Sequence, residues 1–387
     1  VLESRVHHPQ GSTSKQHSSP AGAPALTVDP QIKLDPTTGF PPNTIFNAIQ
    51  MVSADDGWAV GGWNQGINNN NNKNGIVIAH YANGAWTLAA DDASGDVLNS
   101  VSLDSASDGW AGGGISNLLL HYSGGQWRVV SAPNLPPYLS LNSVQMVSAT
   151  EGWAMGNDER SGQDDLVHYL NGKWTVVPTS LMGLQSLSLD SASHGWVVGG
   201  NGNSQLAQYD KGTWQNWGRP LPESFTSVFS ISPTDAWATG YPIPCSCQSA
   251  PASSASQAQA SSRQSALAIN RPLSGNVGTN ILHFDGQRWS NVPLGLPTYD
   301  TMEFITMLSA DEGWAIGLSV PPPNGPAYTL ALHYQNGAWQ VTNLHIEGQL
   351  IAASFPSAND GWAIGLNGAR NAIFLHYQNG AWSVYHR

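Results

Sequence analysis

Residues 105–113 read SASDGWAGG, and variants of this stretch recur along the 387-residue chain. Each copy places a serine five residues before a tryptophan, inside a run that resembles Gly-Trp-Ala-x-Gly. The seven pairs are Ser53/Trp58, Ser105/Trp110, Ser148/Trp153, Ser191/Trp196, Ser232/Trp237, Ser309/Trp314 and Ser357/Trp362. An apolar stretch and a second tryptophan follow each pair: Trp86, Trp127, Trp174, Trp214, Trp289, Trp339 and Trp382. A unit this short cannot bury its own core, so the units must stack, as in a solenoid or a propeller.

The second unit reads as four short strands. Residues 98–103 alternate in polarity, residues 110–114 end in glycines, and residues 117–122 are apolar on both faces. Residues 127–130 form the fourth strand after a tight turn. In other units this turn is Asn-Gly (Asn83-Gly84, Asn171-Gly172, Asn336-Gly337, Asn379-Gly380), the pair that favours a type I′ hairpin.

Third strands that are apolar on both faces indicate sheets covered by neighbours on both sides. Four antiparallel strands in each of seven units therefore predict an all-β fold, a seven-bladed β-propeller. An open solenoid is the alternative, but neither end carries an atypical polar capping repeat. The last unit has its own fourth strand from Trp382, so closure need not exchange an N-terminal strand, although residues 25–40 are available to pair or plug.

These motifs resemble known propeller families. The run from Ser105 through Gly-Trp-Ala-Gly-Gly to the Gly-x-Trp hairpin is similar to BNR/Asp-box and photosystem II assembly-factor-like propellers. The order Gly61-Gly62, Tyr81, Trp86 is similar to the kelch pattern. The resemblance covers residues 46–387 and implies the propeller fold. Its BNR component also allows a sialidase- or glycosidase-like activity.

Composition divides the chain into further segments. Residues 1–24 are rich in Ser, Pro, Gly and His without periodicity, which predicts a disordered tail or stalk, and residues 25–45 form a lead-in segment. Residues 46–387 form the propeller, with a low-complexity insertion at 241–280 in the fifth unit. Cys245 and Cys247 cannot supply a disulfide framework.

Charge excludes several classes of partner. The chain carries a net charge of −12, with only 14 basic residues, so it lacks the cluster that nucleic acid or anionic lipid would require. No apolar run is long enough to span a membrane. Low charge, the polar N-terminal segment and abundant tryptophan are typical of an exported bacterial protein, expected to be extracellular or at the cell surface and monomeric.

Loop length identifies one variable face. In four-stranded units, the 2–3 loops and the connections between units share one face, which we call the variable face. The 1–2 loops and 3–4 turns share the other face and hardly vary. The largest variations are Asn68–Asn74, Asp158–Asp165, Tyr241–Thr279 and Ser319–Tyr328. Variable loops on a rigid scaffold are where binding is usually found.

Candidate ligand-binding residues lie towards this face. The residues six before each repeated serine are predicted to lie at the channel mouth, where they contact a ligand or only water: Asn47, Asn99, Asn142, Gln185, Thr226, Glu303 and Ile351. Loop aromatics add a possible stacking surface: Trp63, Tyr138, Trp217, Tyr241, Tyr299 and Tyr328. Local packing is the alternative for each aromatic residue.

Two repeated polar positions are assigned structural roles. Third strands carry His80, His121, His168, His283, His333 and His376, with Gln208 in the fourth unit. Acids precede most Gly-Trp pairs, at Asp56, Asp108, Glu151, Asp235, Glu312 and Asp360, with His194 in the fourth unit. We expect the histidines to form structural hydrogen bonds and the acids to cap turns. The acidic loop 158–165 is expected to be solvated, with a Ca²⁺ site as the alternative.

These features together predict an exported, non-catalytic binding or scaffold propeller that recognises protein or glycan through the variable face. We expect no metal, no cofactor and no catalytic residue. The alternative is a carbohydrate-active enzyme, but Glu303 lacks an evident carboxylate partner and the arginines share no position near the channel.

Overall fold

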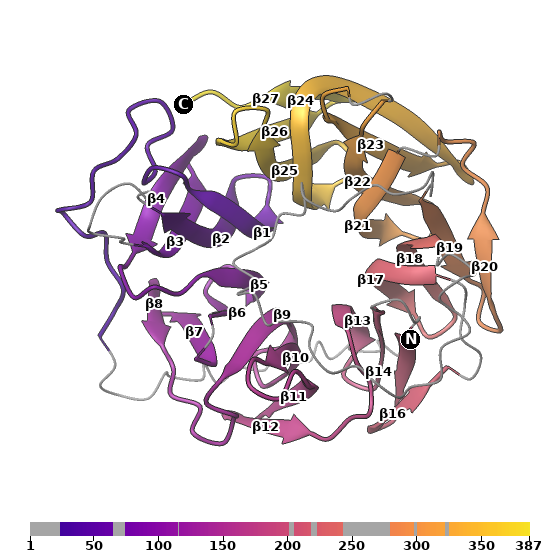
Figure 1. Ribbon diagram of the computed structural model, residues 1–387, viewed down its shortest axis with the longest axis horizontal. Coiled ribbons are helices and arrows are strands. Elements are labelled where there is room, and N and C mark those ends of the chain that lie inside the picture. Colours follow the sequence, from indigo (N-terminus) through magenta and orange to yellow (C-terminus); the bar gives the residue numbers. More distant parts are fainter. Residues whose placement is uncertain are drawn as a thin grey trace, which may run out of the picture.

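A computed structural model describes residues 24–64, 74–114, 116–200, 205–217, 223–242, 279–297, 300–321 and 325–387. Its sheets are arranged around a central axis, with first strands such as β1, β5 and β9 innermost and fourth strands such as β4, β8 and β12 at the rim (Figure 1). The chain is therefore an all-β propeller. The predicted tail at 1–24 lies almost wholly outside the described residues, as does most of the predicted insertion at 241–280, including both cysteines.

Five repeats each form one antiparallel four-stranded sheet in sequence order. The first contains β1 (Ile45–Ser53), β2 (Asp56–Asn64), β3 (Asn74–Ala82) and β4 (Ala85–Asp91). The second and third contain β5 (Leu98–Ser105), β6 (Asp108–Gly113), β7 (Leu118–Ser123) and β8 (Gln126–Val129), then β9 (Leu139–Ser148), β10 (Glu151–Asp158), β11 (Asp164–Leu170) and β12 (Lys173–Val177). The fourth and fifth contain β13 (Leu184–Ser191), β14 (His194–Gly199), β15 (Gln205–Asp210) and β16 (Thr213–Asn216), then β17 (Glu223–Ser232), β18 (Asp235–Pro242), β19 (Asn280–Phe284) and β20 (Trp289–Val292).

The sixth and seventh repeats share one seven-stranded sheet. Its strands are β21 (Asp300–Ser309), β22 (Glu312–Ser319), β23 (Tyr328–Gln335), β24 (Ala338–Ser357), β25 (Asp360–Asn367), β26 (Ala372–Gln378) and β27 (Ala381–Val384). The first half of β24 pairs with β23 and its second half, from Gly348, pairs with β25. The fourth strand of the sixth repeat thus continues directly into the first strand of the seventh.

Tryptophan pairs join consecutive repeats. The second-strand tryptophan of each repeat meets the fourth-strand tryptophan of the next repeat edge to face, with ring centroids 5.2–5.6 Å apart. The pairs are Trp58–Trp127, Trp110–Trp174, Trp153–Trp214, Trp196–Trp289, Trp237–Trp339, Trp314–Trp382 and Trp362–Trp86. Such geometry adds to the stabilisation from burial. Because the last pair joins the seventh repeat to the first, the ring is closed.

The repeated serine explains the uniform 1–2 loops. In every repeat its hydroxyl accepts a hydrogen bond from the backbone N–H two residues later, at 3.2–3.3 Å. This local bond fixes the turn before the second strand. In the 3–4 hairpins, Asn83 and Gly84 both have positive φ, of 53° and 78°, which confirms the predicted type I′ geometry.

The lead-in segment runs along the rim of the ring (Figure 1). Leu26 donates its backbone N–H to Trp127 in the second repeat, and Asp29 donates to the Asp91 carboxylate in the first. Phe40 then packs against Phe46 and Phe374, with ring centroids 5.1 and 6.0 Å away. The segment therefore spans the second, first and seventh repeats and covers the closing seam.

Candidate functional site

The predicted channel residues all occupy β-bulges. The register of each first strand with its second strand shifts at two places, and at the first of these the skipped residue lies six before the repeated serine. The seven positions are Asn47, Asn99, Asn142, Gln185, Thr226, Glu303 and Ile351, called here the bulge ring. A bulge leaves its residue out of the ladder and turns the side chain away from the regular alternation. Sequence spacing therefore located a ring of irregular positions.

Part of the bulge ring bonds to the neighbouring repeat. The Asn47 and Asn99 amides donate to the carbonyls of Leu98 and Leu141, at 2.8 and 2.9 Å. The Thr226 hydroxyl donates to the Met302 carbonyl in the same way, at 3.2 Å. These three side chains link first strands across seams. Gln185 and Glu303 are exposed, and Asn142 is half-buried.

Further polar side chains connect the inner strands. The Gln50 amide donates to the Leu103 carbonyl at 3.0 Å and accepts from its N–H at 2.8 Å. Gln145 makes the same two bonds to Leu189, at 3.0 and 2.7 Å. A glutamine side chain thus binds both polar groups of an extended backbone at two equivalent places.

The described loop aromatics divide into buried and accessible members, and Tyr299 lies outside the described residues. Trp63 is only 2% exposed and its indole donates to the Asp92 carbonyl at 3.0 Å, so its ring presents no stacking surface. Trp217 packs on Trp196 inside a seam. Tyr241 and Tyr328 are half-buried. Tyr138 is exposed beneath the Arg160 guanidinium, whose carbon lies 3.6 Å from the ring centroid.

In six repeats the third-strand histidine contacts the acid that lies two residues before the second-strand tryptophan. The pairs are His80–Asp56, His121–Asp108, His168–Glu151, His283–Asp235, His333–Glu312 and His376–Asp360. Each imidazole also stacks on the second-strand tryptophan, with centroids 4.0–4.4 Å apart. The structural role predicted for the histidines is confirmed. The acids, in contrast, bind histidine, and the serine makes the turn-capping bond.

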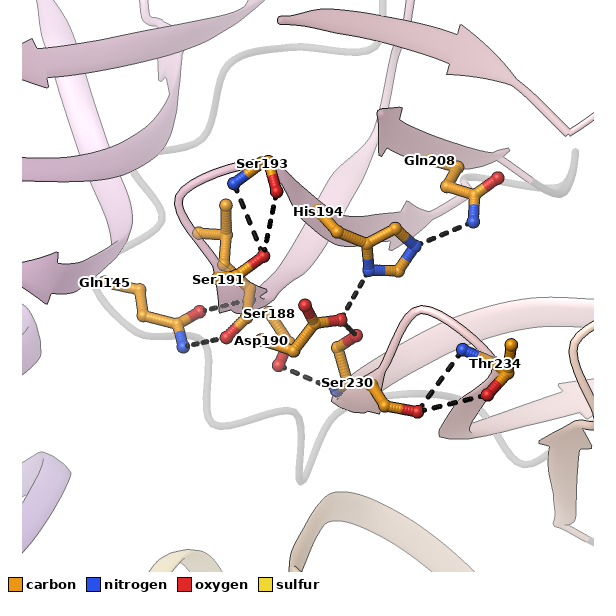
Figure 2. A network of polar contacts seen from close by, with 11 residues as sticks. Gln145, Ser188, Asp190, Ser191, Ser193, His194, Gln208, Ser230 and Thr234 are labelled. Carbon is orange, nitrogen blue, oxygen red and sulfur yellow. Dashed lines mark hydrogen bonds and ion pairs between the residues drawn. The ribbon is translucent and has the colours of Figure 1, made fainter. Parts of the chain in front are cut away.

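The fourth repeat rearranges this contact. His194 stands where the acid would be, and Gln208 on β15, which pairs with Trp196, takes the place of the histidine (Figure 2). The Gln208 amide lies 2.8 Å from His194 Nε2, while Nδ1 contacts the Asp190 carboxylate. Asp190 also accepts from the Ser230 hydroxyl, at 2.7 Å, across the seam to the fifth repeat. The network therefore couples two repeats.

This network has the residue types of a nucleophilic triad but not its connectivity. A nucleophilic serine must donate to the imidazole that accepts its proton. Here Ser230 donates to Asp190 instead, and Gln208 occupies the remaining imidazole nitrogen. Burial raises the pKa of Asp190, but hydrogen bonds from His194 and Ser230 outweigh burial and leave that pKa lowered. The carboxylate is held ionised as the acceptor of these hydrogen bonds, which suits a structural role.

Two buried carboxyl groups lie at the variable-face ends of neighbouring first strands. Glu223 begins β17 and Asp300 begins β21, and they are 6% and 4% exposed. Burial raises the pKa of Glu223, although a hydrogen bond from Asn280 acts in the opposite direction. Burial likewise raises the pKa of Asp300, although a hydrogen bond from Ser319 acts to lower it. Sequence reasoning missed both, because only their burial distinguishes them. Buried acids with raised pKa values mark candidate functional positions.

The acidic loop of the third repeat uses its carboxylates as acceptors for backbone N–H groups. The Asp158 carboxylate accepts the N–H groups of Arg160 and Ser161 at 2.8 and 3.1 Å, and Asp164 accepts the Leu184 N–H at 2.8 Å. Among the residues that the structure describes, no three His, Cys, Asp or Glu side chains are grouped to hold a metal ion. No described helix has the length and apolar character to cross a membrane.

A cleft of about 680 Å³ lies between the sixth and seventh repeats. One wall is β24, through Gln340, Thr342, Leu344 and Ile346. The opposite wall is the 1–2 loop and the 3–4 hairpin of the seventh repeat, including Asn359, Asn379 and Trp382. The cleft is bordered by uniform loops at one end, extends along β24 as far as Ile346, and contains no residue of the bulge ring.

No family model matches the chain, and no curated protein matches it. Several solved structures are similar to the chain. YCF48 bound to D1 peptide shares 16% identity at a TM-score of 0.56, over 92% of this chain and 98% of that chain. The WD40 β-propeller domain of Doa1 shares 10% identity at a TM-score of 0.56, over 92% of this chain and 97% of that chain. The GH74 xyloglucanase from Xanthomonas campestris shares 11% identity at a TM-score of 0.50, over 87% of this chain and 60% of that chain. These likenesses support the β-propeller class.

Proposed function

We propose that the chain is an exported, monomeric, seven-bladed propeller that acts as a protein-binding scaffold. The observation that carries this proposal is the division of polar groups between ring and loops. Histidine–carboxylate pairs hold strands together within six repeats, and the Asn47 and Asn99 amides link neighbouring repeats. The largest variation in loop length falls in the loops of the variable face. A rigid ring with one variable face is suited to recognition.

One similar structure supports protein as the partner, because YCF48 has been solved with D1 peptide bound. On the variable face, Glu303 is exposed and Tyr328 is half-buried, so these two members of the predicted site remain accessible.

Parallel peptide and glycan arrays test this function. We expect peptide binding that weakens at least tenfold in Glu303→Gln or Tyr328→Ala, while both variants keep the melting temperature of the wild type. Binding to glycans alone would overturn the protein-binding assignment.

A carbohydrate-active enzyme is the second candidate. It is favoured by Glu223 and Asp300, because a general acid needs a raised pKa of the kind that burial produces. The xyloglucanase similarity concerns the fold alone. Hydrolysis of a glycan that is abolished in both Glu223→Gln and Asp300→Asn would establish this alternative. Absence of hydrolysis with retained peptide binding would eliminate it.

A further inference from the structure

The third-to-fourth strand hairpins of three neighbouring repeats are almost identical in sequence. Residues 333–339 of the sixth repeat and 376–382 of the seventh both read HYQNGAW, and residues 80–86 of the first read HYANGAW. Because the ring is closed, these three hairpins follow one another around it. Three of the other four hairpins carry Lys, Arg or Asp, in HYLNGKW, QYDKGTW and HFDGQRW. The hairpins of the sixth, seventh and first repeats thus form a row without Lys, Arg, Asp or Glu.

The turn itself does not explain why the glutamine of this motif recurs. Asn336 and Asn379 have positive φ, of 53° and 50°, as the type I′ turn requires. The position before the asparagine is under no such constraint, and the other repeats fill it with Ala82, Ser123, Leu170, Asp210 and Asp285. Gln335 and Gln378 are both exposed there. The repeated glutamine is therefore a feature of the surface and not of the turn.

The cleft lies between the two identical hairpins. They join β23 to β24 and β26 to β27, which are neighbours in the ring (Figure 1). Gln335 of the first hairpin lines the cleft, as do Asn379, Gly380 and Ala381 of the second. The cleft volume of about 680 Å³ is within the range of small-molecule sites, about 300–1,000 Å³. Two identical surface motifs, one repeat apart, suit a ligand whose own groups repeat.

The cleft offers hydrogen-bonding groups without a free charge. Four of its lining residues carry amides: Gln335, Gln340, Asn359 and Asn379. Each amide has two N–H donors and a carbonyl acceptor. Among the described lining residues there is no Asp, Glu, Lys or Arg, and the one histidine, His333, contacts Glu312. Hydroxyl groups also both donate and accept, so a neutral ligand rich in hydroxyls matches this lining.

A half-buried indole gives the cleft an apolar surface as well. Trp382 meets Trp314 edge to face, with ring centroids 5.5 Å apart, so its orientation is fixed by packing. Leu344 and Ile346 also line the cleft and are half-buried. A sugar ring has C–H groups on its faces and hydroxyls at its edge. It can therefore bury apolar surface on these side chains while its hydroxyls reach the amides.

We propose that this cleft binds an uncharged oligosaccharide chain. Sugar hydroxyls bind the amides of Gln340, Asn359 and the two identical hairpins, and the face of a sugar ring packs on the apolar part of the lining. This site goes beyond the proposed protein-binding role, which concerns the variable face. The two proposals can therefore fail separately.

The test is isothermal titration calorimetry on the whole protein with four neutral probes: cellohexaose, xylohexaose, mannohexaose and maltohexaose. Hexagalacturonate is the charged comparison. Gln340→Ala and Asn359→Ala, singly and together, remove amides that line the cleft. Gln215→Ala is the matched control, because Gln215 is exposed and directly follows the fourth-strand tryptophan of the fourth repeat, as Gln340 does in the sixth. Thermal unfolding verifies that every variant folds.

We expect at least one neutral hexasaccharide to bind with a Kd below about 1 mM. Its affinity should fall about threefold or more in each single variant and about tenfold or more in the double variant, as expected for lost hydrogen bonds. Affinity should stay within about twofold of the wild type in Gln215→Ala and Glu303→Gln. Binding by none of the four probes, or binding that the double variant leaves unchanged, would overturn the proposal.

Three further outcomes would also overturn it. Tighter binding of hexagalacturonate than of every neutral probe would contradict an uncharged ligand. A peptide from the arrays that loses affinity in the double variant, when no oligosaccharide does, would make the occupant a peptide. Oligosaccharide binding that is lost in Glu303→Gln alone would move the sugar site to the variable face. Peptide binding at that face is reported separately by Glu303→Gln and Tyr328→Ala.

Discussion

Trp86 of the first repeat meets Trp362 of the seventh edge to face, with ring centroids 5.6 Å apart and an interplanar angle of 83°. This contact joins residues 276 positions apart with the geometry used between sequential repeats. Trp110 and Trp174, in neighbouring repeats, lie 5.3 Å apart at 78°. The closing seam is therefore built like the others.

Replacing either second-strand tryptophan should test this equivalence. We expect Trp362→Ala and Trp110→Ala each to lower the free energy of unfolding by about 3–5 kcal/mol, because both remove a buried aromatic ring. Denaturant melts measure both, with the exposed Val129→Ala as a control expected within about 0.5 kcal/mol of the wild type. A loss below about 1 kcal/mol for Trp362→Ala alone would mean that the ring is not closed by this contact.

The lead-in segment should stabilise the ring, and the residues before it should not. Deleting residues 1–23 is expected to leave the melting temperature unchanged, since their composition offers little to bury. Deleting residues 1–44 also removes Phe40, which packs on Phe46 and Phe374. This truncation should lower the melting temperature by several degrees. Equal melting temperatures for the two truncations would show that the segment adds nothing to closure.

The buried Asp190–His194 pair should contribute more to the free energy of unfolding than the partly exposed histidine–carboxylate pairs. His194→Ala leaves a buried carboxylate with fewer donors, and losses of about 3–5 kcal/mol are typical of such changes. His80→Ala is the matched control, where Asp56 is about one-third exposed and water replaces the lost partner, so a smaller loss is expected.

The same pair predicts a pH dependence on the acid side. Because the folded-state pKa of Asp190 is lowered, its stabilising contribution is present above the unfolded value, about 3.9, and is lost as the pH falls through the folded pKa. The free energy of unfolding, measured between pH 2 and 7, should fall less steeply on acidification for Asp190→Asn than for the wild type. Superimposable pH profiles would contradict an ionised Asp190.

Glu223 should produce the opposite dependence. Its folded-state pKa is raised, so its contribution to stability is present below about pH 4 and is lost as the pH rises through the folded pKa. Glu223→Gln keeps an amide oxygen for Asn280 and removes the buried charge. We expect the variant to gain stability relative to the wild type at pH 7 and to lose that advantage at pH 4. An advantage that is independent of pH would show that Glu223 is not desolvated.

Trp63 is expected to act as a core residue. Trp63→Ala should cost about 3–5 kcal/mol, because the side chain is fully enclosed. Tyr138→Ala, which removes an exposed ring beneath Arg160, should cost about 1 kcal/mol or less. If Trp63→Ala melted like the wild type, its indole would have to be accessible.

Local chemistry in the sequence determined the repeated unit. Three features act within one unit: the serine that accepts an N–H two residues later, the Asn-Gly pair with positive φ, and the apolar third strand. Their spacing therefore predicts strands and turns without knowledge of the neighbouring units. The histidine roles followed from the same reasoning. Even the bulge ring was located by counting back from the serine, although its irregular geometry was not foreseen.

Contacts between units were decided only by the tertiary structure. The partner of Trp362 depends on how the ring closes, and the cleft depends on how the sixth and seventh repeats pack on each other. Glu223 and Asp300 look like ordinary acids until burial raises their pKa values. The reason is physical: hydrogen bonds between near neighbours in the chain depend on local geometry, whereas burial at a seam depends on two surfaces supplied by different repeats.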